Sequence, residues 1–253
     1  MRKLPVLAAL GLTLALTSCG AGGEGQTSPS PEPTEQEEGH LTQSYAGPRQ
    51  TYAAALERLL REQILPTGED VSLASDGYNM EENQFSVCDV DGDGEEELIL
   101  LYTTIMTAGN RGYVYAWNLE TGELDVQLET SPGLTFYESG AVQSDALHNQ
   151  QLMSRDFWPY SLYRYDAYLD TYLEVGVVSA WGRDALENGY PEEADTSGTG
   201  FVYYISTRGT DDERPLDASI YEAWRYVYVR DGRELQPEYL ALTEENIQRL
   251  LEE

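Results

Sequence analysis

Residues 88–102, CDVDGDGEEELILLY, join a dense acidic segment to an apolar one. Six carboxylates occupy the nine positions from Asp89 to Glu97, and the residues that follow are almost wholly apolar. Within 97–103, apolar side chains occur at both odd and even positions, which lie on opposite faces of a strand. This run therefore predicts a central β-strand covered on both faces. Carboxylates crowded beside a buried strand repel one another unless a cation lies among them. The segment therefore predicts a metal site at the entrance to a central strand.

The spacing of the acids favours calcium as the metal. Calcium binds roughly six to eight oxygen ligands, and carboxylates at alternate positions of a tight loop can all point at one centre. Asp89, Asp91 and Asp93 alternate in this way, and Gly94 permits a sharp turn. An EF-hand would need a bidentate Glu at loop position twelve, and that position is Leu100. The loop is therefore not an EF-hand.

The loop resembles the Asp-x-Asp-x-Asp-Gly-x-x-Asp/Glu calcium loop of FG-GAP and VCBS-type repeats, which occurs in the integrin α-propeller. The resemblance implies that the side chains of Asp89, Asp91, Asp93 and Glu97 bind calcium, together with the backbone carbonyl of Glu95. Because the loop occurs once in this chain, it implies one blade-like unit inside a different sheet rather than a propeller. The alternative is a solvated turn in a chain rich in Asp and Glu.

The N-terminus predicts an exported lipoprotein. Arg2 and Lys3 precede an apolar run from Leu4 to Leu16 that is too short to span a bilayer permanently. The run ends in Leu-Thr-Ser-Cys, which resembles the lipobox of bacterial lipoproteins. The resemblance implies that residues 1–18 are a signal peptide, that Cys19 carries a diacylglyceryl group, and that the protein is anchored to the cell membrane facing outward. The alternative is an ordinary secretory cleavage near the same point.

Charge and residue counts exclude several classes of function. Removal of the signal peptide would delete Arg2, Lys3 and no acid, and would take the formal net charge from −30 to −32. Nucleic-acid binding is excluded because it requires basic patches. Lys3 is the only lysine, so the mature chain has no lysine for Schiff-base chemistry. With Cys19 lipidated, Cys88 has no partner for an intramolecular disulfide, and stability must come from the core or a metal.

The pattern along the chain predicts a linker followed by one domain. Residues 19–44 are a lipidated cysteine and a disordered linker rich in Gly, Ser, Pro, Thr, Glu and Gln, and residues 45–253 form a single globular domain. The predicted fold class is α+β, an antiparallel β-meander with an amphipathic helix at each end. Residues 217–230 fit either a helix or a strand, and their first half favours a helix. The other predicted elements are helices over 51–66 and 242–253, hairpins over 113–129 and 162–178, and a strand over 200–207.

The sequence singles out no catalytic residues. His148 is the only histidine outside the linker, and Cys88 precedes the loop in a strand, where a buried structural thiol is favoured over a nucleophile. The aromatic stretch 157–174 is typical of strands, with a binding surface as the alternative. We therefore expect a lipid-anchored binding module with a structural calcium site, whose partners are the membrane and an envelope protein or glycan. The alternative is a cell-wall or carbohydrate hydrolase that uses a pair of carboxylates.

Overall fold

The computed structural model describes residues 47–148, 156–185, 189–207 and 214–252. These residues belong to one compact unit, Ser44–Glu253. The predicted signal peptide, Cys19 and the predicted linker lie outside the described residues. The unit consists mostly of strands in two antiparallel sheets, accompanied by helices, so the predicted α+β class is confirmed.

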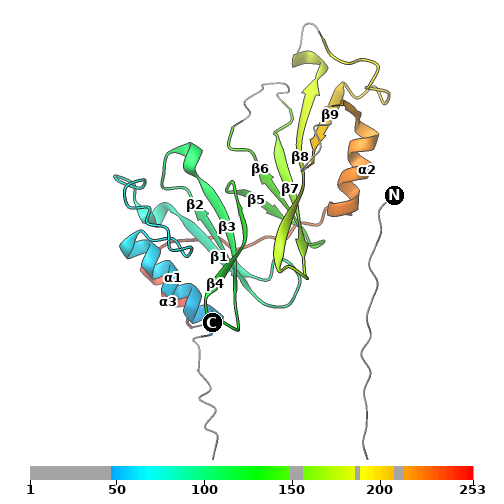
Figure 1. Ribbon diagram of the computed structural model, residues 1–253. Coiled ribbons are helices and arrows are strands. Elements are labelled where there is room, and N and C mark those ends of the chain that lie inside the picture. Colours follow the sequence, from blue (N-terminus) through cyan, green and yellow to red (C-terminus); the bar gives the residue numbers. More distant parts are fainter. Residues whose placement is uncertain (1–46, 149–155, 186–188, 208–213, 253) are drawn as a thin grey trace, which may run out of the picture. The chain divides into compact units, whose positions relative to one another are not determined.

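The first sheet has five strands in the order β11-β1-β2-β3-β4. Strands β1 to β4 are labelled in Figure 1. Strand β2 lies at its centre, and alternate side chains of β2 enter two different cores. The prediction that this strand is covered on both faces is confirmed. The bounds of the strands are Gln84–Cys88 (β1), Glu97–Tyr102 (β2), Arg111–Trp117 (β3), Leu124–Thr130 (β4) and Leu240–Ala241 (β11).

The second sheet has six strands in the order β10-β9-β8-β7-β6-β5. The prediction of a single antiparallel meander is wrong, because the strands are divided between two sheets. The division falls between β4 and β5, where Pro132 lacks the N–H that a strand needs to continue its ladder. The bounds are Gly133–Phe136 (β5), Ala141–Asp145 (β6), Tyr160–Asp166 (β7), Thr171–Gly182 (β8), Phe201–Ser206 (β9) and Leu216–Asp217 (β10).

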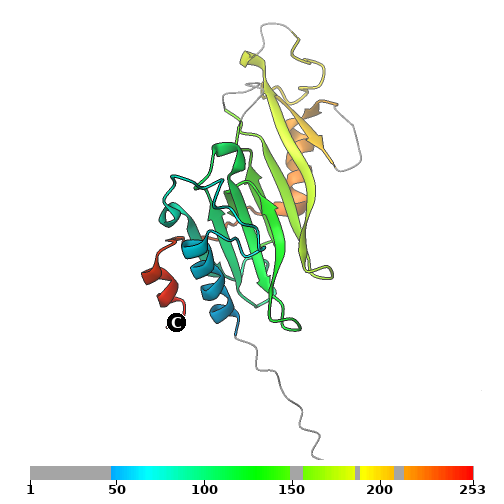
Figure 2. The ribbon, with the colours of Figure 1, turned by 60° about the vertical axis from the view of Figure 1, so that its left-hand side comes forward.

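Two of the three described α-helices cover the first sheet (Figures 1 and 2). Helix α1 (Pro48–Glu62) begins with a proline, and helix α3 (Glu244–Arg249) is capped by Thr243, whose side chain accepts a hydrogen bond from the Asn246 N–H. The described residues also form three short 3-10 helices: η1 (Met80–Glu82), η2 (Thr107–Gly109) and η3 (Arg183–Ala185). Among the described residues, no helix combines the length and the apolar character needed to cross a lipid bilayer.

Residues 217–230, which fit either a helix or a strand and whose first half the sequence favoured as a helix, form helix α2 (Ala218–Val229). The Asp217 side chain caps this helix by accepting a hydrogen bond from the Ser219 N–H. Helix α2 lies on the second sheet (Figure 1), and its Tyr221 ring stacks on Tyr203 of β9 at a centroid distance of 4.0 Å. Tertiary contacts with the sheet thus decide the structure of a segment whose aromatic and β-branched residues also suit a strand.

A separate core joins the two sheets. Ile99, Val114 and Leu128 enter it from the first sheet, and Phe136, Val142 and Tyr172 enter it from the second. The predicted hairpin over 113–129 forms. Strict alternation along its second strand would place Leu124 and Leu128 on one face, but Leu124 packs on the core beneath α1 and Leu128 enters the core between the sheets. A β-bulge between Val114 and Tyr115 shifts the register of β4 and turns Leu128 toward the second sheet.

Candidate metal centre

The acidic loop connects β1 to β2 and is shaped by hydrogen bonds from its own backbone. Asp89 accepts two of them, from Gly92 N–H to Oδ1 at 2.7 Å and from Gly94 N–H to Oδ2 at 3.1 Å. Gly92 and Gly94 have φ angles of +84° and +96°, which side chains with a Cβ rarely adopt. The sharp turn predicted at Gly94 is therefore confirmed.

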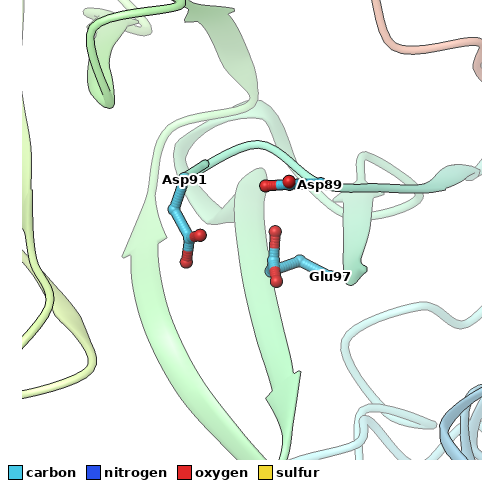
Figure 3. Close-up of side chains that lie close together, drawn as sticks. All are labelled: Asp89, Asp91 and Glu97. Atoms are coloured by element: carbon cyan, nitrogen blue, oxygen red, sulfur yellow. The ribbon is translucent and has the colours of Figure 1, made fainter. Parts of the chain in front are cut away.

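Three carboxylates converge inside this loop. Each of Asp89, Asp91 and Glu97 offers an oxygen, and these oxygens lie within 4.8 Å of one another. Figure 3 shows Asp89 and Asp91 on the loop and Glu97 at the start of β2, with the three side chains around a common space. Asp89 is exposed, whereas Asp91 is 9 % exposed and Glu97 is 1 % exposed. The group could hold a metal ion, and its all-oxygen donors suit a hard cation.

The other acids of the loop lie outside this group. Asp93 accepts a hydrogen bond from the Glu95 N–H at 2.8 Å, and both residues are exposed. Glu96 forms two hydrogen bonds with Arg49 of α1, each 2.9 Å long, and its carbonyl accepts a bond from the Tyr52 hydroxyl. Glu96 is thus paired with an arginine, whereas Asp89, Asp91 and Glu97 face one another.

Burial makes the negative charge of this group costly. The pKa of Glu97 is raised to about 8, first by burial and then by the charges of Asp91, Asp93 and Asp89, although the Val90 N–H opposes the shift. The pKa of Asp91 is raised to about 6 mainly by burial. A cation at this point would reverse the sign of the local potential and lower both pKa values.

The loop lies where the two sheets meet. The Tyr172 hydroxyl of β8 donates to the Val90 carbonyl at 3.4 Å, and the Thr171 hydroxyl donates to the carbonyl of Gln127 in β4 at 2.8 Å. Gln127 also donates through Nε2 to Asp91 Oδ2 at 3.2 Å and to Asp170 Oδ1 at 2.6 Å. A rearrangement of the loop would therefore disturb hydrogen bonds to strands of both sheets.

Gln127 and Asp170 were not predicted to lie near this centre. The β-bulge in β4 makes Gln127 the additional residue between two paired positions, and Asp170 lies in the turn between β7 and β8. The only signal in the sequence is a glutamine between Val126 and Leu128, and a polar residue in a strand ordinarily indicates the solvent face.

Cys88, the last residue of β1, has the environment of a structural thiol. It is partly buried, and burial is the main cause that raises the pKa of its thiol, with the charge of Glu97 adding to the shift. A nucleophilic cysteine needs the opposite shift, which a nearby positive charge would cause. The raised pKa fits the predicted structural thiol, and the absence of a catalytic role for Cys88 stays a prediction.

Comparisons of the chain with protein-family models, with curated proteins and with solved structures found no match.

Proposed function

We propose that this protein is a lipid-anchored, extracytoplasmic binding module whose domain is stabilised by a calcium ion in the β1–β2 loop. The observation that carries the proposal is the convergence of Asp89, Asp91 and Glu97, two of them buried, at the junction of two sheets. In the bound state Asp93 and the carbonyl of Glu95 would add the remaining ligands that the FG-GAP resemblance implies. The lipid anchor rests on the sequence around Cys19.

Calcium fits this donor set better than a transition metal does. The converging groups are carboxylates, with no imidazole and no thiolate among them, and zinc or copper sites commonly use these softer ligands. Calcium tolerates irregular coordination and is bound by extracellular modules with a Kd on the order of 10⁻⁴–10⁻³ M. Weak affinity of this kind is sufficient for a structural role outside the cell.

The same geometry argues against the three carboxylates as the acid–base pair of a glycoside hydrolase. Retaining enzymes of that class hold two carboxyl groups about 5–5.5 Å apart on either side of the scissile bond. The spacing here is comparable, but Glu97 is 1 % exposed, so a sugar ring has no access to it. Burial therefore favours an ion over a substrate between these groups.

A binding role is supported by aromatic side chains at the surface of the second half of the chain. Tyr168 is 92 % exposed, Tyr226 is 66 % exposed and Trp158 is 50 % exposed. Tyrosine and tryptophan are enriched in protein interfaces because they bury a large area with few rotatable bonds. The ligand we propose is an envelope protein or a glycan.

Thermal unfolding with and without calcium tests the metal site. Binding to the folded state alone stabilises it by RT ln(1 + [L]/Kd), about 1.4 kcal/mol at ten times Kd, and each kcal/mol raises the Tm of a domain of this size by roughly 2–4 °C. We expect millimolar calcium to raise the Tm and EDTA to lower it. Asp91→Asn should abolish this difference.

Glu95→Gln is the matched control, because Glu95 is expected to contribute only its backbone carbonyl. This variant should respond to calcium as the wild type does. Identical melting of the wild-type domain in calcium and in EDTA would contradict the proposal and leave the loop as a solvated turn.

A further inference from the structure

Gln127 of β4 lies outside the acidic loop and beside its converging carboxylates. Its side chain is 3 % exposed, and the amide lies against Asp91, one of the three converging carboxylates. Its Nε2 atom contacts carboxylate oxygens of both Asp91 and Asp170. Its Oε1 atom is buried and has no hydrogen-bond partner among the described residues.

A buried amide oxygen without a partner is unusual and costs free energy. The amide nitrogen of Gln127 lies between the carboxylates of Asp91 and Asp170. The negative charge of these two groups would also attract a metal ion. A half-turn about the last side-chain torsion, which is soft for glutamine, would exchange the positions of nitrogen and oxygen. The oxygen would then face the carboxylate of Asp91, and Nε2 would give up its two hydrogen bonds to Asp91 and Asp170 and take the present position of Oε1. That arrangement is stable only with a cation beside the oxygen.

We infer that Gln127 is a further ligand of the metal ion and binds it through Oε1. This inference rests on the proposed calcium site and extends it from one loop to a neighbouring strand. Amide oxygens are ordinary calcium ligands. When the amide turns, Asp170 keeps the Tyr165 hydroxyl as a hydrogen-bond donor at 2.8 Å and lies exposed in its turn.

With Gln127 as a ligand, the ion would connect the β1–β2 loop to the place where the two sheets meet. The backbone carbonyl of Gln127 already accepts a hydrogen bond from Thr171 of the second sheet. A ligand at position 127 therefore connects the ion to β4 and, through that bond, to β8. Calcium would then hold the two sheets together in addition to closing the loop.

Terbium luminescence tests the inference directly. Tb³⁺ replaces Ca²⁺ in oxygen sites, and its emission lifetimes in H₂O and D₂O count the water molecules bound to the ion. Gln127→Leu should add one bound water and weaken the binding of Tb³⁺ and Ca²⁺ at least about tenfold. Gln127→Glu, which retains an oxygen ligand, should bind with the water count of the wild type. Gln143→Leu, at a half-buried glutamine of β6, is the matched control and should change neither quantity.

Two negative results have different meanings. If the wild type binds neither ion, the proposed calcium site and this inference both fail. If the wild type binds, and Gln127→Leu leaves the affinity and the water count unchanged, only the inference fails. Should Gln127→Leu not fold, an additional bound water in Gln127→Glu would equally overturn it.

Discussion

Glu97 shows how one buried carboxylate can oppose folding at neutral and alkaline pH. Its carboxylate is 1 % exposed and faces two aspartates, and its pKa is raised from 4.5 to about 8. Between these two values the folded state binds a proton that the unfolded state has lost. The free energy of unfolding therefore falls as the pH rises through this range.

We predict that the metal-free domain loses stability as the pH rises from about 4.5 to about 8, the two pKa values of Glu97. Each pKa unit is worth about 1.4 kcal/mol, so the loss due to Glu97 is on the order of a few kcal/mol. Denaturant unfolding in EDTA at several pH values measures it. Saturating calcium should reduce the loss, because the ion rather than a proton then compensates the charge.

Glu97→Gln isolates this effect from the repulsion among the other acids of the chain. The variant keeps an oxygen to accept the Val90 N–H bond and removes the titrating group. In EDTA it should be more stable than the wild type at pH 9 and lose less stability with pH. An equal slope in the two proteins would show that Glu97 does not titrate in this range.

At the scale of the secondary structure elements, helix α2 depends on a glycine in the strand beneath it. Gly176 of β8 is buried, and a Cβ at this position would lie 2.9 Å from Trp224 Cζ2 and 3.0 Å from Ile205 Cγ2. Both distances are shorter than normal packing allows. The absence of a side chain at 176 thus lets the indole of α2 approach the sheet.

Gly176→Ala should destabilise the domain by about 1–3 kcal/mol, the usual cost of overpacking. For a domain of this size the Tm would fall by roughly 2–4 °C for each kcal/mol, and differential scanning calorimetry measures the change. Glu174→Ala, at an exposed position of the same strand, is the control and should change the Tm little. A Tm of Gly176→Ala equal to that of the control would mean that Trp224 moves aside without cost.

At the scale of the whole molecule, the proposed role depends on attachment to a membrane. The chain carries a formal net charge of −30, and a net charge of this sign opposes attraction to anionic lipids. Membrane association, if the proposal is correct, therefore depends on the proposed lipid on Cys19.

We predict that wild-type protein expressed in a bacterial host sediments with membranes. Cys19→Ala should release the protein or leave its precursor uncleaved, and immunoblots of the fractions distinguish these outcomes from retention. The control is Asp91→Asn, which should change calcium binding and leave processing unaltered. Normal processing and membrane retention of Cys19→Ala would refute lipidation at this residue.

The sequence by itself determined the local features of this protein. The alternating acids and Gly94 predicted a sharp acidic loop, and the apolar residues of both parities after Glu97 predicted a buried central strand. Helix α1 and the two hairpins also follow from periodicity and turn residues within short windows. These predictions succeed because backbone sterics and side-chain alternation act over a few neighbouring residues.

The tertiary structure alone decided which distant residues meet. It divided the strands between two sheets, continued the helix favoured for the first half of 217–230 as far as Val229, and selected Asp89, Asp91 and Glu97 from six neighbouring acids. It also brought Gln127 to the loop through a β-bulge of one residue in β4. The bulge turns the side chains that follow it to the opposite face of the strand, and the sequence carries no distinct signal for it. The physical reason is that these outcomes depend on packing free energy summed over the whole domain, and no single window of sequence contains that sum.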